Sequence, residues 1–238
     1  MGKSHLSRLA SPTTFGVERK GSKWIARPLP GPHSFDECLT LSCVLRDKLG
    51  YAKTKKEITK ILTDKNVLVD KIVRREYKFP VGFMDVIEVL KLGEVYRIIY
   101  DTKGRLIPIK IDVKESNLKI LKIINKTMVQ GSKLQINFSD GKNALLDKLS
   151  CKVGDSVLFD LVKKEVVKTL PLENGAEIFI TGGKYIGKLG KIKEVQKENR
   201  LQPSNILFEI DGQEHITLLK YAFVVGKNKL EVKLEEAK

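Results

Sequence analysis

The sequence holds few of the side chains that build catalytic or metal centres. Among its 238 residues are three cysteines, three histidines and one tryptophan. The cysteines Cys38, Cys43 and Cys151 form no CxxC pair and no disulfide framework. The histidines are scattered along the chain, without the spacing of metal ligands. We therefore expect no metal and no cofactor, and we interpret Cys38 and Cys43 as small buried apolar groups.

Long apolar runs are also missing. No window approaches ~18 consecutive apolar residues, which is about the length that a membrane-spanning helix needs. The N-terminal residues lack the apolar core of a signal peptide. These absences count against a membrane protein, and the sequence predicts a protein that stays in the cytoplasm.

Acidic residues are outnumbered by basic ones. There are 44 lysines and arginines against 29 aspartates and glutamates, which gives a formal net charge of +15. An excess of this size indicates a polyanionic partner, either nucleic acid or an anionic membrane surface. Because membrane segments are missing, the charge favours nucleic acid.

Residues 1–33 show no helical or strand period and are interrupted by glycines and prolines. Their basic residues are opposed by a single acid, Glu18. We expect a basic extension that is disordered in isolation, or an arm that becomes ordered when its cations and Trp24 lie against phosphates and bases. The candidate RNA-binding residues of this extension are Lys3, His5, Arg8, Arg19, Lys20, Lys23 and Trp24.

Residues 34–49 have the pattern of a first helix. Ser34 and Glu37 have the spacing of a capping box, and apolar residues recur at helical spacing in the second half of the segment. Gly50 stands where a left-handed C-cap is needed. Arg46 projects away from the apolar stripe, so it is a candidate for RNA contact.

A second helix is predicted for residues 54–63. Thr54 and Glu57 form a capping box at its start. The apolar stripe of this helix consists of Ile58, Ile61 and Leu62. Lys56 and Lys60 share the opposite face, where two like charges four residues apart repel each other by a few tenths of a kcal/mol. Either a solvated surface or a neighbouring polyanion explains such a face.

A hairpin is predicted next, with a strand at 67–73, a charged turn at 74–78 and a strand at 83–89. The turn adds positive charge without matching acid, which favours the polyanion. The candidate RNA-binding residues of the helices and hairpin are Arg46, Lys53, Lys55, Lys56, Lys60, Lys71, Arg74, Arg75 and Lys78. Over residues 34–92, this order of elements resembles the S4-type RNA-binding domain, which occurs in ribosomal proteins and in RNA-modifying enzymes.

From residue 93 onward the hydrophobic period changes to two, which is typical of strands. The predicted strands cover residues 95–100, 106–111, 119–124, 134–138, 157–161 and 164–169. The dipeptide Asp140-Gly141 is a strong hairpin signal. Short strands and turns at this spacing predict a central small β-barrel or sandwich over residues 93–171.

Residues 172–238 begin with glycines that alternate with lysines and lead into a strand. This pattern resembles the KOW motif, a strand, loop and strand in a small SH3-like barrel of ribosomal proteins and transcription elongation factors. The structural glycines of the loop are Gly182, Gly183, Gly187 and Gly190, and its candidate RNA-binding residues are Lys184, Tyr185, Lys188 and Lys191. A nucleotide-binding loop is excluded, because Ile178 stands where its first glycine is required and Tyr185 follows the lysine. Strands at 205–210 and 214–219 are expected to close the barrel.

The motifs of the whole chain resemble one family. They are Lys3-Ser4-His5-Leu6, Gly31-Pro32-His33, Thr181-Gly182-Gly183 and the segments 79–86, 96–104 and 223–227. In this order they are similar to the archaeal and eukaryotic small-subunit ribosomal protein family S4e, with the archaeal branch favoured by length. The resemblance implies a β-rich α+β protein without a reaction of its own. Its partners would be small-subunit rRNA and neighbouring ribosomal proteins, without a homo-oligomer.

One position departs from that family, and two alternatives stay open. Thr40 stands where relatives often carry proline, which would let the first helix run longer here. An rRNA-modifying enzyme such as a pseudouridine synthase is the first alternative, but Ile107 stands where those synthases carry their catalytic aspartate, so we expect no enzyme. A transcription elongation factor is the second, because such factors also use KOW units and residues 93–171 leave room for a polymerase-binding domain.

Overall fold

The computed structural model describes residues 5–129, 133–146, 151–196, 204–227 and 230–234. The chain divides into two compact units, Met1–Asn117 and Leu118–Lys238. Both units consist mainly of antiparallel strands with few helical turns, so the protein is β-rich α+β. None of the helices in the described segments is long and apolar enough to cross a membrane.

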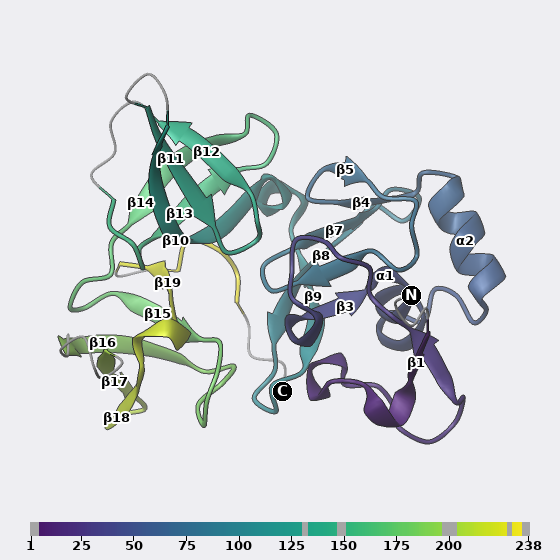
Figure 1. Cartoon of the computed structure of the whole chain (residues 1–238), viewed down its shortest axis with the longest axis horizontal. Coiled ribbons are helices and arrows are strands. Elements are labelled where there is room, and N and C mark those ends of the chain that lie inside the picture. The colour runs from purple at the N-terminus through teal and green to yellow at the C-terminus, as the bar shows by residue number, and fades with distance from the viewer. Residues whose placement is uncertain (1–4, 130–132, 147–150, 197–203, 228–229, 235–238) are drawn as a thin grey trace. The chain divides into compact units, whose positions relative to one another are not determined.

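The first unit contains a five-stranded antiparallel sheet in the order β5-β4-β7-β8-β9 (Figure 1). Its strands are β4 (Val67–Val69), β5 (Ile72–Val73), β7 (Val86–Val89), β8 (Glu94–Tyr100) and β9 (Leu106–Ile111). Strand β8 pairs with β7, with Val86 opposite Arg97. The strands expected at 95–100 and 106–111 are therefore present, but they extend the sheet of the first unit instead of joining the strands after residue 117. A short turn ending at Gly93, with φ of 64°, explains this pairing, since such turns join neighbouring antiparallel strands.

The predicted first helix, residues 34–49, is wrong in its first half. Residues Phe35–Glu37 form a 3-10 turn (η3), and Cys38–Thr40 form strand β3, which pairs with β6 (Pro80–Gly82). Helical backbone starts only at α1 (Leu41–Cys43) and continues in the π-helical turn η4 (Val44–Lys48). Thr40 is its N-cap, because its hydroxyl accepts the amide of Cys43 at 3.3 Å. Ser34 instead donates its hydroxyl to the Glu37 carboxylate. Thr40 thus starts the helix and does not lengthen it.

The second helix is confirmed. Helix α2 spans Lys55–Thr63, and both hydrogen bonds of the Thr54 and Glu57 capping box are present. Ile58 and Leu62 are completely buried. The burial of these two side chains fixes which face of α2 points outward.

The strand predicted at 67–73 is interrupted. Asp70 and Lys71 have φ of 50° and 64° and form a two-residue turn between β4 and β5. The Asp70 carboxylate is buried and accepts the amide of Val86 at 3.1 Å, which stabilises this turn without glycine. The strand predicted at 83–89 likewise begins only at Val86, since Met84 has φ of 67°.

Residues 5–33 are folded, which corrects the expectation of a disordered extension. Strand β1 (His5–Ser7) pairs with β2 (Trp24–Ala26), and two 3-10 turns, η1 (Arg8–Ala10) and η2 (Thr13–Phe15), lie between them. Phe15 is completely buried and Ile25 nearly so. Strands of three residues are too short to show a period, so the sequence pattern missed them.

The second unit contains two five-stranded antiparallel sheets, in the orders β12-β11-β10-β13-β14 and β18-β17-β16-β15-β19. After the 3-10 turn η5 (Val113–Asn117) of the first unit, the first of these sheets consists of β10 (Leu118–Val129), β11 (Lys133–Phe138), β12 (Asn143–Leu146), β13 (Ser156–Asp160) and β14 (Glu165–Leu170). The second consists of β15 (Glu177–Ile180), β16 (Leu189–Gln196), β17 (Asn205–Ile210), β18 (Gln213–Leu218) and β19 (Ala222–Gly226), with the 3-10 turn η6 (Leu219–Tyr221) before β19. The expected strands of this half are confirmed within a few residues, and Asp140-Gly141 joins β11 to β12.

Candidate nucleic-acid interface

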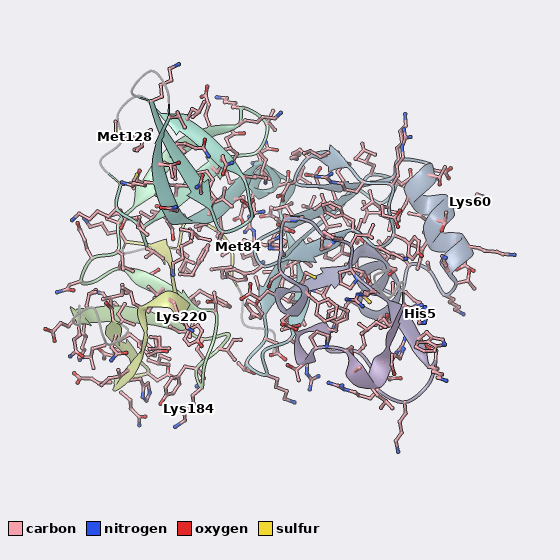
Figure 2. All side chains as sticks on the ribbon, in the orientation of Figure 1. His5, Lys60, Met84, Met128, Lys184 and Lys220 are labelled. Atoms are coloured by element: carbon pink, nitrogen blue, oxygen red, sulfur yellow. The ribbon has the colours of Figure 1, made fainter. Side chains whose placement is uncertain are left out.

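The outer face of α2 carries unneutralised positive charge. Lys56 and Lys60 are exposed, and neither forms an ion pair with any described residue. Lys60 is marked on this helix in Figure 2. Because Ile58 and Leu62 fasten the opposite face to the core, the two ammonium groups are held toward solvent.

The loop of residues 74–79 brings further cations next to this helix. The carbonyl oxygens of Tyr77 and Phe79 accept the amides of Ser42 and Leu41, at 3.0 Å each. These bonds attach the loop to the N-terminal turn of α1, whose amides lack helical partners. The loop is therefore positioned by backbone contacts.

Two cation–aromatic contacts order the basic side chains. The Lys55 ammonium lies 4.5 Å from the Tyr77 ring centroid, which links the start of α2 to the loop. The Arg74 guanidinium lies 4.2 Å from the Phe79 ring centroid. Such contacts contribute about 0.5–1 kcal/mol at exposed sites and restrict the side chains to few conformations.

We call this surface the S4 basic face. It consists of Lys53, Lys55, Lys56, Lys60, Arg74, Arg75 and Lys78. Its acids are already engaged: Glu57 caps α2, and Glu76 accepts the amide of Lys78. The amide of Lys53, followed by the groups of Thr54, lowers the pKa of Glu57, so that carboxylate stays ionised in its cap. The face therefore combines lysine and arginine groups with acids that are engaged in local contacts, which favours phosphate ligands.

Two predicted residues of this region have internal partners instead. The Lys71 ammonium pairs with Glu88 at 2.6 Å and donates to the Ser116 hydroxyl at 2.7 Å. The Arg46 guanidinium pairs with Asp47 at 2.9 Å, and this hydrogen bond raises the pKa of Arg46. Both cations are engaged within the first unit, so the structure does not bring them into the S4 basic face.

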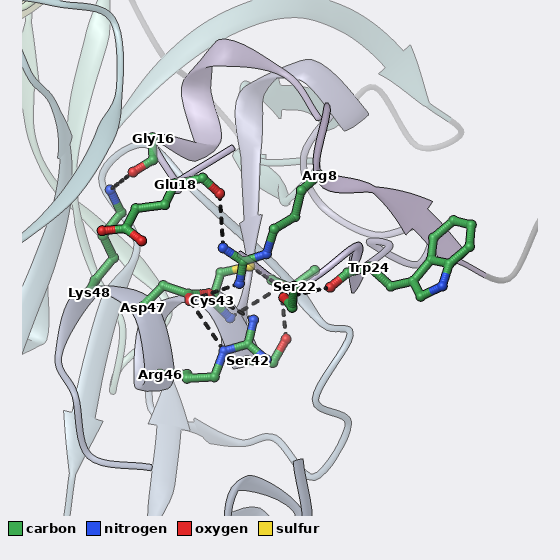
Figure 3. A network of polar contacts seen from close by, with 11 residues as sticks. Arg8, Gly16, Glu18, Ser22, Trp24, Ser42, Cys43, Arg46, Asp47 and Lys48 are labelled. Atoms are coloured by element: carbon green, nitrogen blue, oxygen red, sulfur yellow. Dashed lines mark hydrogen bonds and ion pairs between the residues drawn. The ribbon is translucent and has the colours of Figure 1, made fainter. Parts of the chain in front are cut away.

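The N-terminal segment is fastened to the π-helical turn by basic side chains (Figure 3). Arg8 is buried and donates to the carbonyl of Glu18 at 3.0 Å and to Asp47 at 3.3 Å. Lys48 donates to the carbonyl of Gly16 at 3.0 Å. Arg8 therefore stabilises the fold, although its sequence context predicted RNA contact.

The remaining candidates of this segment differ in exposure. Arg19 is exposed and donates to the carbonyl of Leu9 at 2.6 Å, and Lys20 is exposed. Lys3 lies outside the described residues. Trp24 is 49% exposed. Its ring centroid lies 4.7 Å from that of His5 in a T-shaped arrangement, and the Lys23 ammonium lies 5.1 Å from the Trp24 ring centroid. An exposed indole beside cations can stack on a nucleobase.

The loop between β15 and β16 has the glycines that its geometry requires. Gly183 and Gly187 have φ of 82° and 80°. A Cβ atom on Gly182 would lie 2.4 Å from the Tyr221 ring, and one on Gly190 would lie 2.8 Å from the Phe208 ring. In this loop Lys184 is exposed and Lys188 is half-buried, and Lys191 is exposed on the adjoining strand β16, which also contains Gly190. The loop thus carries cations on a tightly packed backbone.

Among the described residues, no group of three or more His, Cys, Asp or Glu side chains is placed so that it could hold a metal ion. Cys38 and Cys43 are completely buried, and burial raises the pKa of their thiols to about 12 and about 11. The interpretation of both cysteines as buried apolar groups is confirmed.

This β-rich chain has a short helix and a β-hairpin that share a basic face. These features define the class of S4-domain proteins. Family models agree with this class. The S4 domain matches residues 44–87, the RS4NT (NUC023) domain matches residues 1–36, and Ribosomal family S4e matches residues 92–166.

Individual relatives cover nearly the whole chain. The small ribosomal subunit protein eS4 of Archaeoglobus fulgidus is 42% identical over 223 residues, which are 94% of this chain and 93% of that protein. The eS4 of Methanothermobacter thermautotrophicus is 37% identical over 237 residues, 99% of this chain and 98% of that protein. The crystal structure of 30S ribosomal protein S4e from Thermoplasma acidophilum matches with a TM-score of 0.71 and 29% identity, covering 82% of this chain and 98% of that one. This chain belongs to the ribosomal protein eS4 family, which is a family of structural proteins and not of enzymes.

Proposed function

We propose that this chain is a structural constituent of the small ribosomal subunit that binds small-subunit rRNA. Membership of the eS4 family supports the location in the ribosome, and hence in the cytoplasm. The S4 basic face carries the proposal of RNA binding, because five of its seven cations are exposed and two are half-buried, while its acids are engaged in local contacts.

The contacts are expected to be distributed over several surfaces. A net charge of +15 exceeds what the S4 basic face alone supplies. We propose that the exposed cations around Trp24 and the lysines of the loop between β15 and β16 bind further rRNA segments. Recognition would rely on phosphates and on RNA shape, which suits structured RNA whose base edges lie in a deep groove.

We also propose a finer division of the chain. The predicted boundary between residues 171 and 172 falls between β14 and β15, where one five-stranded sheet ends and the next begins. The sheet of β15 to β19 would be an SH3-like KOW barrel, and the sheet of β10 to β14 a small central barrel. Neighbouring ribosomal proteins would contact surfaces that the RNA leaves uncovered.

Sedimentation and filter binding test the proposal. The full-length chain, added to small subunits depleted of their own copy, should sediment with them after a high-salt wash. It should also bind small-subunit rRNA more tightly than large-subunit rRNA of equal length. Absence from the salt-washed particles, together with recovery on RNA polymerase, would show that the chain acts elsewhere.

A further inference from the structure

Two aromatic rings stack on the surface of the sheet formed by β15 to β19. Tyr185 comes from the loop between β15 and β16, and His215 comes from β18. Their ring centroids are 4.4 Å apart with an interplanar angle of 25°. The sequence motif predicted a role for Tyr185 alone, because His215 lies thirty positions later and only the fold brings it near.

The Tyr185 and His215 rings pack on the core but are not fully buried in it. Phe208 on β17 is completely buried and meets both rings, with its centroid 5.8 Å from Tyr185 and 6.0 Å from His215. Tyr185 and His215 are only half-buried. The core is therefore closed by Phe208, and the stacked pair adds ring surface that is accessible from outside.

Lysines accompany these rings. The Lys184 ammonium lies 5.4 Å from the Tyr185 ring centroid, and the Lys220 ammonium lies 4.8 Å from the ring centroid of Tyr221. The Tyr221 ring packs against Gly182 and Gly183, which precede Lys184 in the same loop. Both lysines are exposed and form no ion pair with a described residue. Figure 2 marks both on the β15 to β19 part of the second unit.

The backbone at Lys220 to Ala222 is fixed by several bonds. Thr181 donates its amide and its hydroxyl to the carbonyl of Tyr221, at 2.9 and 3.1 Å. Lys122, on β10, donates to the carbonyls of Lys220 and Ala222 at 2.9 and 2.7 Å. A surface held in this way keeps its shape before a ligand arrives, which lowers the entropy cost of binding.

We propose that the Tyr185–His215 pair is a stacking site for an unpaired nucleobase of single-stranded RNA, with Lys184 and Lys220 contacting the flanking phosphates. The inference rests on the proposed rRNA binding and specifies its ligand at this surface. A duplex hides the faces of its bases within the stack, so only an unpaired base can extend the two rings. Rings flanked by cations are the usual means of holding single strands.

Crosslinking and affinity measurements on the full-length chain test the site. The probe is a non-self-complementary RNA of about 12 nucleotides with a central 4-thiouridine, a length in the range that small binding folds cover. Irradiation should link the thiouridine to Tyr185 or His215. Tyr185→Leu and His215→Leu should each lower single-strand affinity roughly tenfold. Tyr185→Leu should leave the salt dependence of binding unchanged, because it removes no charge.

Ring-preserving variants and a duplex supply the controls. Tyr185→Phe and His215→Phe should bind the single strand like the wild type, and affinity for the same RNA paired with its complement should not respond to any of these changes. Equal single-strand affinity of the Leu variants and the wild type, or crosslinks confined to other segments such as that of Trp24, would overturn the stacking site while leaving rRNA binding intact. A wild-type chain that binds neither the probe nor small-subunit rRNA would overturn the proposed function as well.

Discussion

The Lys119 ammonium lies 3.0 Å from a carboxylate oxygen of Asp140, and both side chains are buried. Asp140 also accepts the amide of Lys142 and pairs with its ammonium at 3.2 Å. Burial alone would raise the pKa of Asp140, but the two lysines outweigh it and hold the pKa below its ordinary value. The pair therefore fixes the turn between β11 and β12 against β10.

Breaking this pair should destabilise the protein. Lys119→Met leaves the Asp140 carboxylate buried with one partner fewer, and removal of one member of a buried ion pair costs about 3–5 kcal/mol. We expect a loss near the lower end, about 3 kcal/mol, because Lys142 remains. Urea unfolding measures it, with exposed Lys163→Met as the control, for which we expect less than about 0.5 kcal/mol. Equal stability of both variants would mean that the pair contributes little.

The burial of Phe15 leads to a second prediction. If residues 2–30 were disordered, their deletion would leave the fold intact. Because Phe15 is completely buried, we expect the deletion to destabilise the fold. Phe15→Ala should lower the free energy of unfolding by about 3–5 kcal/mol, which is the usual cost of emptying a core aromatic site. Leu9→Ala, at a side chain that is 71% exposed, is the matched control and should change little. A Phe15→Ala variant as stable as the wild type would restore the view of a dispensable arm.

The N-terminal segment shows where prediction from sequence stops. Helix α2 was predictable because its cap and apolar stripe are local and lie within ten residues of each other. The strands β1 and β2 pair residues that are far apart, with His5 opposite Ala26, and each strand is too short for a hydrophobic period. Tertiary burial, and not local pattern, decides their structure.

Some residues that were predicted to bind RNA have internal partners instead, for a related reason. The number of charged residues can be read from the sequence, but the sequence does not show which acidic side chain lies near which basic side chain in the fold. Arg8 and Lys71 were counted as candidates, yet Asp47 and Glu88, distant in sequence, engage them. Lys56 and Arg75 have no such partner among the described residues, so for them the prediction of RNA contact stands.

A cluster around Glu94 leads to a prediction on pH. The Lys110 ammonium at 2.6 Å, with the hydroxyls of Tyr51 and Tyr96, lowers the pKa of Glu94 from 4.5 to about 2. In the unfolded state the carboxyl regains its ordinary pKa, so unfolding takes up a proton between about pH 4.5 and pH 2. The stabilisation from this cluster is therefore fully present above about pH 5 and is lost as the pH falls.

Glu94→Gln should reveal this dependence. The difference in free energy of unfolding between the wild type and Glu94→Gln should be largest near neutral pH and should shrink as the pH falls to about 3. Urea titrations at a series of pH values measure it. Glu173→Gln, at an exposed position, should show no such trend. A difference independent of pH would mean that ionisation of Glu94 does not matter.

The S4 basic face gives the last prediction, because five of its seven cations are exposed while its acids are engaged. Replacing Lys56, Lys60, Arg74 and Arg75 by alanine should weaken binding to small-subunit rRNA and flatten its salt dependence. Each lost phosphate contact should reduce the slope of log affinity against log salt by about 0.7–0.9. The matched control removes the same charge from exposed lysines elsewhere, by alanine at Lys91, Lys103, Lys114 and Lys163, and should leave the slope nearly unchanged. Filter binding over a range of salt concentrations, with circular dichroism to verify folding, measures both variants. Equal slopes for the two would show that net charge, and not this face, determines affinity.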